Sequence, residues 1–283
     1  MALNINTNMT SLLAVQGMNR NGNELSKTFQ RLITGSRING AGDDPAGFAV
    51  STRLSSRIRG SNVAIRNVQD AVSVTQVADA AMQETMNSLQ KMHDLVVSAG
   101  GAGVSPADRT SIMTEVKGLI AEIQRIATGT KFNDRSLLGG SYSGKIQVGA
   151  DHGNIMSVAI SGTSVRTLGV NSTGTSLASI GEGITGDTLN QNISTDLQVI
   201  AGALNKVSTI RAKLGAVQNR LNGVINGLNS VIAATTESNS RITDTDIASE
   251  VAAMTRDQIK QQVGAAVLAQ ANQVPISILT LLK

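Results

Sequence analysis

The sequence predicts a mainly α protein, an elongated antiparallel bundle of coiled-coil-like long helices from both chain ends, with a small β-hairpin region in the middle. Three observations predict this fold class. Aliphatic residues recur at alternating steps of four and three through residues 193–232, which keeps one face of a helix about 60 Å long against partner helices. The 283 residues include three Phe, one Tyr and no Trp, which favours thin aliphatic seams over a globular core. Both chain ends are amphipathic, and such ends are expected to pair with something.

The first predicted element is a short amphipathic helix. Met18, Leu25, Phe29 and Leu32 share one helical face, and the helix is expected to end near Gly35. It carries too few apolar residues to be stable alone in water. We therefore expect its apolar face to need a partner.

A turn-rich break separates this helix from a second, longer one. Asp44 before Pro45 has the form of an N-cap followed by proline at the first helical position. The helix is expected to run to about Ser98. A metal or acid/base role for the paired Asp43 and Asp44 is the alternative, although the sequence offers no partner residue for it.

A third helix follows a glycine-rich reversal. Ser105 and Asp108 match a capping box, and an uninterrupted apolar stripe leads to an end at Gly129. Because the connection is short, this helix should lie antiparallel to the second.

The character of the chain changes between residues 133 and 192, which are rich in Gly, Ser and Thr. The runs 145–148 and 156–160 read as strands, and we expect one or two hairpins and a mobile surface loop in this region. The long helix at 193–232 follows, then a polar break at 239–245, then a final amphipathic helix. Arg211 and Gln218 interrupt the stripe of the long helix, and we expect them to face a polar pocket or a neighbouring subunit.

Composition excludes several classes of protein. The net charge of +4 is mild and has no basic run, so no nucleic acid is expected as partner. The absence of Cys removes disulfides, thiol nucleophiles and thiolate metal sites. The sequence contains no apolar run of about 18 residues, so no membrane span is predicted. It also lacks a cationic segment followed by an apolar run, so no cleaved signal peptide is predicted.

An enzyme carried by the middle of the chain was the least favoured alternative. Neither His belongs to a His-Glu-x-x-His zinc motif, and no phosphate-binding loop or Ser/His/Asp grouping can be argued. We expect no catalytic residue, no metal and no cofactor.

Several motifs in collinear order resemble the terminal motifs of bacterial flagellin. They are GSRIN at 35–39 leading into DDPAG at 43–47, LGAVQNRL at 214–221 and VLAQANQVP at 267–275. The opening MALNINTN and the closing LLK are similar too. The resemblance covers roughly residues 1–138 and 190–283.

The resemblance implies a structural subunit that self-assembles into the helical flagellar filament of swimming bacteria. It implies an extracellular location, reached through type III export without a cleaved signal peptide. The implied partners are other copies of the chain, the filament cap and hook-associated junction proteins, and the flagellar export apparatus with its export chaperone. A hook-filament junction protein is the alternative, but such proteins would be expected to depart from the terminal motifs that this chain keeps.

The resemblance also implies a division of the chain. Residues 1–40 and 241–283 would form the two halves of an inner core helical domain. Residues 41–138 and 191–240 would supply the helices of a rod domain, and 139–190 a short β-rich variable insert. A chain exported unfolded benefits from the absence of disulfides and from ends that order only with partners.

Candidate site residues follow from the stripes and from the resemblance, and for each the alternative is an ordinary position in an intramolecular bundle or on its surface. Those expected in subunit assembly are Leu25, Phe29, Leu32, Ile247, Val251, Leu268 and Leu281. Those expected in the rod seam are Ile112, Val116, Leu119, Ile123, Leu204, Leu214, Leu221 and Leu228.

Two further sets come from the resemblance alone. Lys91, Leu95 and Glu122 match positions through which family members contact an innate immune receptor. The first is usually Arg, and Lys cannot reproduce a bidentate contact, so this partner stays open. By family analogy the insert could carry O-glycans, the alternative being an unmodified soluble loop; the candidate sites are Ser141, Ser143, Ser172 and Thr173.

Overall fold

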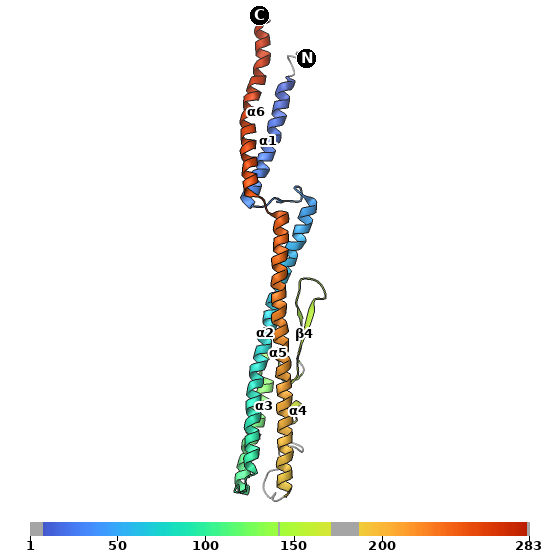
Figure 1. Ribbon diagram of the computed structural model, residues 1–283, viewed down its shortest axis with the longest axis vertical. Helices are drawn as coiled ribbons and strands as arrows, with labels where there is room; N and C mark the ends of the chain where they lie inside the picture. Colours follow the sequence, from blue (N-terminus) through green and yellow to red (C-terminus); the bar gives the residue numbers. More distant parts are fainter. Residues whose placement is uncertain (1–7, 141, 171–186, 282–283) are drawn as a thin grey trace. The chain divides into compact units, whose positions relative to one another are not determined.

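The computed structural model describes residues 8–140, 142–170 and 187–281, without the side chains of 187 and 274–281 (Figure 1). The elements in order are α1 (Met9–Thr34), α2 (Pro45–Ala99), α3 (Pro106–Gly129), β1 (Lys131–Phe132), β2 (Arg135–Ser136), β3 (Tyr142–Gln147), β4 (Ile155–Ile160), α4 (Val165–Leu168), α5 (Asp187–Thr243) and α6 (Ile247–Leu281). This confirms a mainly α fold with long helices from both chain ends and a small antiparallel hairpin region in the middle.

Two compact units make up the chain. Residues 1–58 and 233–283 form unit 1, and residues 59–232 form unit 2, so that both boundaries fall inside long helices, one in α2 and one in α5.

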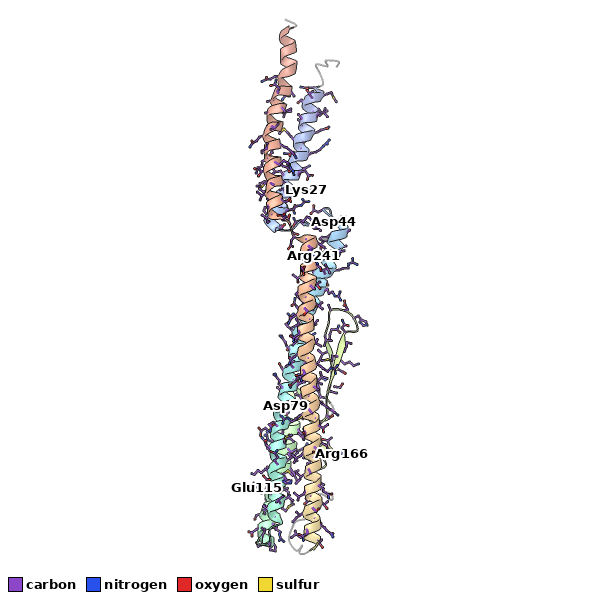
Figure 2. All side chains as sticks on the ribbon, in the orientation of Figure 1. Lys27, Asp44, Asp79, Glu115, Arg166 and Arg241 are labelled. Atoms are coloured by element: carbon purple, nitrogen blue, oxygen red, sulfur yellow. The ribbon has the colours of Figure 1, made fainter. Side chains whose placement is uncertain are left out.

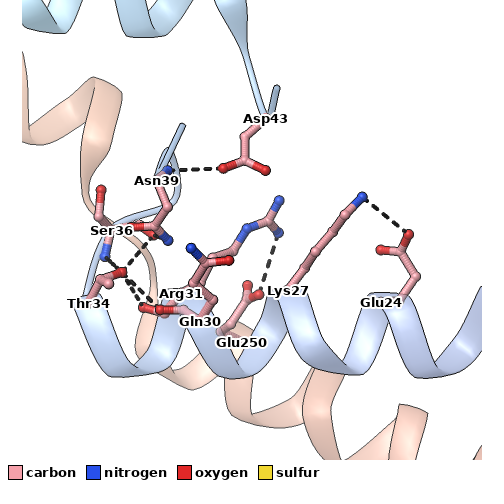
Figure 3. A network of polar contacts seen from close by, with 9 residues as sticks. All are labelled: Glu24, Lys27, Gln30, Arg31, Thr34, Ser36, Asn39, Asp43 and Glu250. Carbon is pink, nitrogen blue, oxygen red and sulfur yellow. Dashed lines mark hydrogen bonds and ion pairs between the residues drawn. The ribbon is translucent and has the colours of Figure 1, made fainter. Parts of the chain in front are cut away.

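In unit 1, α1 and α6 run antiparallel. The Nδ2 of Asn8 donates to the carbonyl of Ala271 at 2.8 Å near one end of the pair. Near the other end Arg31 and Glu250 form an ion pair at 3.4 Å (Figure 3). The α1 helix begins at Met9, earlier than predicted, because the Asn8 side chain accepts from the amide of Ser11 and caps it.

The linkers between the helices of unit 1 hydrogen-bond to each other. The amide of Arg37 donates to the carbonyl of Thr243 at 2.6 Å, and the amide of Thr245 donates to the carbonyl of Gly35 at 3.1 Å. Gly35 has φ +66°, which ends α1 with a left-handed residue. Asp43 accepts from the amide of Asn39 in the same region (Figure 3). The two connections thus form a small clasp, defined here as residues 35–39 with 242–245.

The two capping signals read from the sequence, at the starts of α2 and α3, are confirmed. Asp44 accepts from the amide of Gly47 at 3.0 Å, and Ser105 with Asp108 forms a full capping box. The polar break before the last helix is shorter than predicted, because α5 continues to Thr243. Asp246, which accepts from the amide of Ala248 at 3.0 Å, caps α6.

In unit 2, α2, α3 and α5 pack side by side (Figure 1). The order of contacts shows that α2 runs antiparallel to both α3 and α5. A Cβ built on Gly100 would lie 3.4 Å from Cδ1 of Ile193, whereas Asp79, earlier on α2, contacts Arg211, later on α5. Between α2 and α3, Lys91 contacts Glu115 at 2.7 Å. The predicted reversal between these two helices is therefore present.

The β3–β4 hairpin covers one side of this helical core. Met156, Val158 and Ile160 of β4 are buried while the residues between them are exposed. Met156 packs with Val68 of α2 and Leu221 of α5. The strands are paired in register from Tyr142 opposite Ile160 to Gln147 opposite Ile155. The short β1–β2 pair and the single-turn α4 were not predicted, because two to four residues are too few for a periodic signal.

Candidate assembly surface

The faces that α1 and α6 turn toward each other combine polar and small residues with the half-buried Leu25, Leu32 and Leu268. Asn21 donates its Nδ2 to the carbonyl of Asp257 at 2.7 Å, and the buried Asp257 carboxylate contacts Lys260 at 2.8 Å. Met18 lies against Gly264, where an added Cβ would come within 3.1 Å of its Cγ. The helices approach closely here because the position has no side chain.

Several aliphatic residues of α6 are exposed instead of packed in this contact. Five of them, at a four-residue step interrupted at Thr255, are 42% to 55% exposed. A step of four residues forms a ridge that slants around a helix, the shape that fits into the groove of another helix. This surface, called the α6 ridge below, consists of Ile247, Val251, Ile259, Val263 and Val267.

The α1 helix also carries large apolar residues on its exposed surface. Its exposed large apolar residues are Met9, Leu12, Leu13, Val15, Phe29 and Ile33, the last being 81% exposed. Exposed large apolar residues on both helices of a pair indicate an interaction site rather than a finished core.

The seven residues predicted for subunit assembly occupy three kinds of position. The sequence prediction missed Ile259, Val263 and Val267 of the α6 ridge, although the four-residue step in the sequence could have identified these three. The predicted residues are the half-buried Leu25, Leu32 and Leu268, the exposed Phe29, Ile247 and Val251, and Leu281, whose side chain lies outside the described residues.

Comparison with known proteins identifies this arrangement. The family model of the bacterial flagellin N-terminal helical region matches residues 5–143, and that of the C-terminal helical region matches residues 197–282. The chain is 36% identical to the flagellin of Bacillus subtilis (strain 168), with 99% of this chain and 100% of the relative covered. This chain belongs to the bacterial flagellin family. It is 35% identical to flagellin FlaB1 of Treponema pallidum (strain Nichols), with 99% of each chain covered.

Membership of the flagellin family decides the function at the level of the whole chain. The protein is a structural subunit of the extracellular flagellar filament and not an enzyme. A solved structure of a putative flagellar hook-associated protein from Vibrio parahaemolyticus has a TM-score of 0.61 at 13% identity, covering 71% of this chain and 100% of that one. This likeness concerns the fold alone. The full-length flagellin relatives favour the filament subunit over a junction protein.

Residues predicted for the rod seam lie along the helices of unit 2, at two depths. The buried ones are Val116, Ile123, Leu214 and Leu221. The half-buried ones are Ile112, Leu119, Leu204 and Leu228. On α5 the most deeply buried line includes Asp196 and Ala203, one residue before the leucines at 197 and 204 that the stripe indicated.

The three residues matched to a receptor contact do not lie together as one exposed patch. Lys91 is exposed and pairs with Glu115, which is labelled in the lower part of Figure 2. Leu95 is half-buried against the core. Glu122 pairs instead with Arg125, which lowers the pKa of the Glu122 carboxyl, and it lies seven residues, or about 10 Å, along α3 from Glu115. Glu115 is thus the acidic residue beside Lys91.

One of the four predicted O-glycosylation positions falls within the described residues. Ser143 is exposed on β3, whereas Ser141, Ser172 and Thr173 lie outside the described residues. Among the described residues, no group of three or more His, Cys, Asp or Glu could hold a metal ion. Within the same residues no helix is long and apolar enough to cross a membrane.

Proposed function

We propose that copies of this flagellin-family chain join in the filament through the α6 ridge and the exposed apolar residues of α1. The exposed apolar surface of this helix pair carries the proposal, since polar and small groups take part in the α1–α6 contact while large apolar side chains of both helices stay exposed. Covering apolar surface gains about 25 cal/mol per Å². A neighbouring copy with the same two helices supplies a surface of the required kind.

Seeded assembly of the purified chain tests this proposal. The full chain should form filaments visible by electron microscopy, and a chain lacking residues 247–283 should not. The sharper comparison is Ile259→Asn with Val263→Asn, which removes two aliphatic side chains from the α6 ridge. At about 1.5 kcal/mol for each buried side chain, the critical concentration should rise about 100-fold.

Gln262→Asn is the matched control, because Gln262 is exposed on the same helix but outside the ridge. It should assemble like the unmodified chain, and circular dichroism should show equal helix content in all monomers. Normal assembly by the ridge variant, or equal loss in the control, would contradict the proposal.

The layout of the subunit follows from the same reasoning. Residues 1–40 and 241–283 would form the inner core helical domain, 41–138 and 191–240 the rod domain, and 139–190 the variable insert. The extensive antiparallel pairing of α1 with α6 supports the first assignment. Labelling of single cysteines introduced at positions 263 and 145 tests it. In assembled filaments, position 263 should be shielded from a bulky thiol reagent and position 145 should be accessible.

The finer partners and the export route also belong to this proposal. The filament cap, the hook-associated junction proteins, and the export apparatus with its chaperone would each engage the terminal helices, where the exposed apolar residues are. Export without a cleaved signal peptide is tested by mass spectrometry of the chain recovered from filaments. A chain lacking more than its initiator Met would contradict it.

Surface recognition is the last part of the proposal. For the innate receptor contact at Lys91, Leu95 and Glu122, the exposure of Lys91 is the supporting observation. Lys91→Ala should weaken binding to the receptor ectodomain, and Glu122→Ala should then do the same; an effect of Glu115→Ala instead would move the contact to the Lys91 pair. O-glycans at Ser141, Ser143, Ser172 or Thr173 would appear as added mass on peptides from native filaments.

A further inference from the structure

A carboxylic acid is buried in the apolar seam of α5. Asp196 is 0% exposed and lies between the buried Ile193 and Ile200 at the spacing of the core-facing residues. Neither carboxyl oxygen has a hydrogen-bond partner among the residues that the structure describes. An ionised carboxylate in such a place is costly unless it is paired.

No ion pair or hydrogen bond of a charged group on the described surrounding elements involves the Asp196 carboxyl. On α2, Lys91 pairs with Glu115 of α3, and His93 pairs with the exposed Asp94. On α3, Arg109 donates its Nε to the carbonyl of Ala99 at 3.2 Å. The others contact neighbouring backbone or local partners: Asp108 contacts Ser105, and Lys206 of α5 contacts the carbonyls of Thr167 and Leu168 on α4. Arg166 is the remaining charged residue on α4.

Burial raises the pKa of Asp196 to about 7, from an ordinary value of 3.8. Loss of hydration in the apolar seam is the cause, since it disfavours the charged form. The protonated form of Asp196 is therefore favoured when the side chain is buried, and the carboxylate is favoured when it is exposed to water.

We propose that Asp196 is a proton-controlled latch that holds the N-terminal part of α5 against α2 and α3. Protonated, the carboxyl stays in the seam beside Ile193, which contacts Gly100 near the end of α2. Ionised, it favours a state in which this part of α5 opens to water. Asp196 lies nine residues after the start of α5 at Asp187, so opening requires only the first few turns of the helix to come away.

The direction of the pH effect follows from proton binding. Between pH 3.8 and about 7 the packed state binds more protons than the open state, so the stability of packing falls as pH rises through this range. The contribution of protonated Asp196 to the stability of packing is therefore complete at the acidic end of this range and lost at the alkaline end. Between pH 5 and 8 the population of the open state should rise on the order of 100-fold.

Two measurements on the full-length monomer test the latch. Carbon-13 NMR of the Asp carboxyls should show one resonance, absent in Asp196→Asn, that titrates near pH 7. Hydrogen exchange of amides 190–203 should show that the opening population, relative to Asp196→Asn at the same pH, increases on the order of 100-fold from pH 5 to 8. Comparing variants at one pH removes the intrinsic pH dependence of exchange.

Asp94→Asn is the control, because the Asp94 side chain is 84% exposed, and it should behave as the unmodified chain. A carboxyl that titrates near its ordinary value, or equal pH dependence in the unmodified chain and Asp196→Asn, overturns the proposal. If Asp196→Asn fails to fold, the titration of the unmodified chain decides alone.

Discussion

Arg211 of α5 and Asp79 of α2 form a two-point ion pair, with Nε to Oδ1 at 2.8 Å and a second guanidinium nitrogen to Oδ2 at 3.3 Å. Another nitrogen of the same guanidinium donates to Oε1 of Gln83. The hydrogen bonds from Arg211 to Asp79 raise the pKa of Arg211 further above its ordinary value. Polar residues on two apolar stripes therefore meet at one height of unit 2.

The ion pair is expected to fix the register of α5 against α2. Arg211→Met should destabilise the monomer by about 1–2 kcal/mol, because it leaves Asp79 unpaired beside the apolar seam. The two side chains are 28% and 36% exposed, which keeps the effect well below that of a fully buried pair. Urea unfolding of the monomer measures it.

A double-mutant cycle separates the pair from the single losses. Arg211→Met with Asp79→Leu should cost less than the sum of the two single changes, by about 1 kcal/mol. Additive losses would show that the two residues do not act together.

The same pair shows where the sequence was sufficient and where it was not. Arg211 is an exception on the stripe, as predicted, but its partners are in the same chain, which counts against the expectation that it faces a polar pocket or a neighbouring subunit. Asp79 interrupts the stripe of α2 in the same way, and matching the two exceptions would have predicted the contact. For Gln218 the expectation stays a prediction.

Other features follow different rules of predictability. The helices and caps were predictable because they depend on residues three or four apart, as with Ser105 and Asp108. The depth of Asp196 was not, since a helix with several neighbours buries a face wider than one stripe. The outward direction of the α6 ridge was also not predictable, because an apolar stripe does not reveal whether its partner is in the same chain.

The capping box of α3 gives a pH-dependent prediction. Ser105→Ala should destabilise unit 2 by about 1 kcal/mol at pH 7, because the N-terminal amides of α3 lose an acceptor. Hydrogen bonds from the Ser105 side chain and amide lower the pKa of Asp108, so the contribution of Asp108 is present above its ordinary pKa and is lost as the pH falls through its lowered value.

Thermal unfolding at pH 7 and pH 3 measures this effect. The difference between the unmodified chain and Ser105→Ala should be smaller at pH 3. Ser105→Thr keeps the hydroxyl and is the matched control, so a loss in this variant equal to that in Ser105→Ala would argue against capping as the cause.

The close approach of Met18 to Gly264 predicts a graded response to side-chain size. Gly264→Ala should be nearly neutral, because the gain of up to about 1 kcal/mol in helix propensity offsets a contact of 3.1 Å with a flexible Met. Gly264→Val should separate α1 from α6 and increase hydrogen exchange around Asn21. Gly223→Ala is the control, since a Cβ there meets nothing within 4 Å, and it should stabilise α5. Equal protection of Asn21 in Gly264→Val and the unmodified chain would contradict the prediction.

The clasp depends on the left-handed backbone of Gly35, whose carbonyl accepts from the amide of Thr245. Gly35→Ala should cost about 1 kcal/mol because a Cβ is disfavoured at φ +66°, and Gly35→Val should cost more. Gly35→Asn should be milder than either, since Asn tolerates this conformation. Because a Cβ at Gly35 meets no other atom within 4 Å, the series reports backbone conformation without steric overlap.

Hydrogen exchange of the Thr245 and Arg37 amides measures opening of the clasp. Opening should increase in the order Asn, Ala, Val, and a series ordered by side-chain volume alone, with Asn worse than Ala, would show that the φ of Gly35 does not control it.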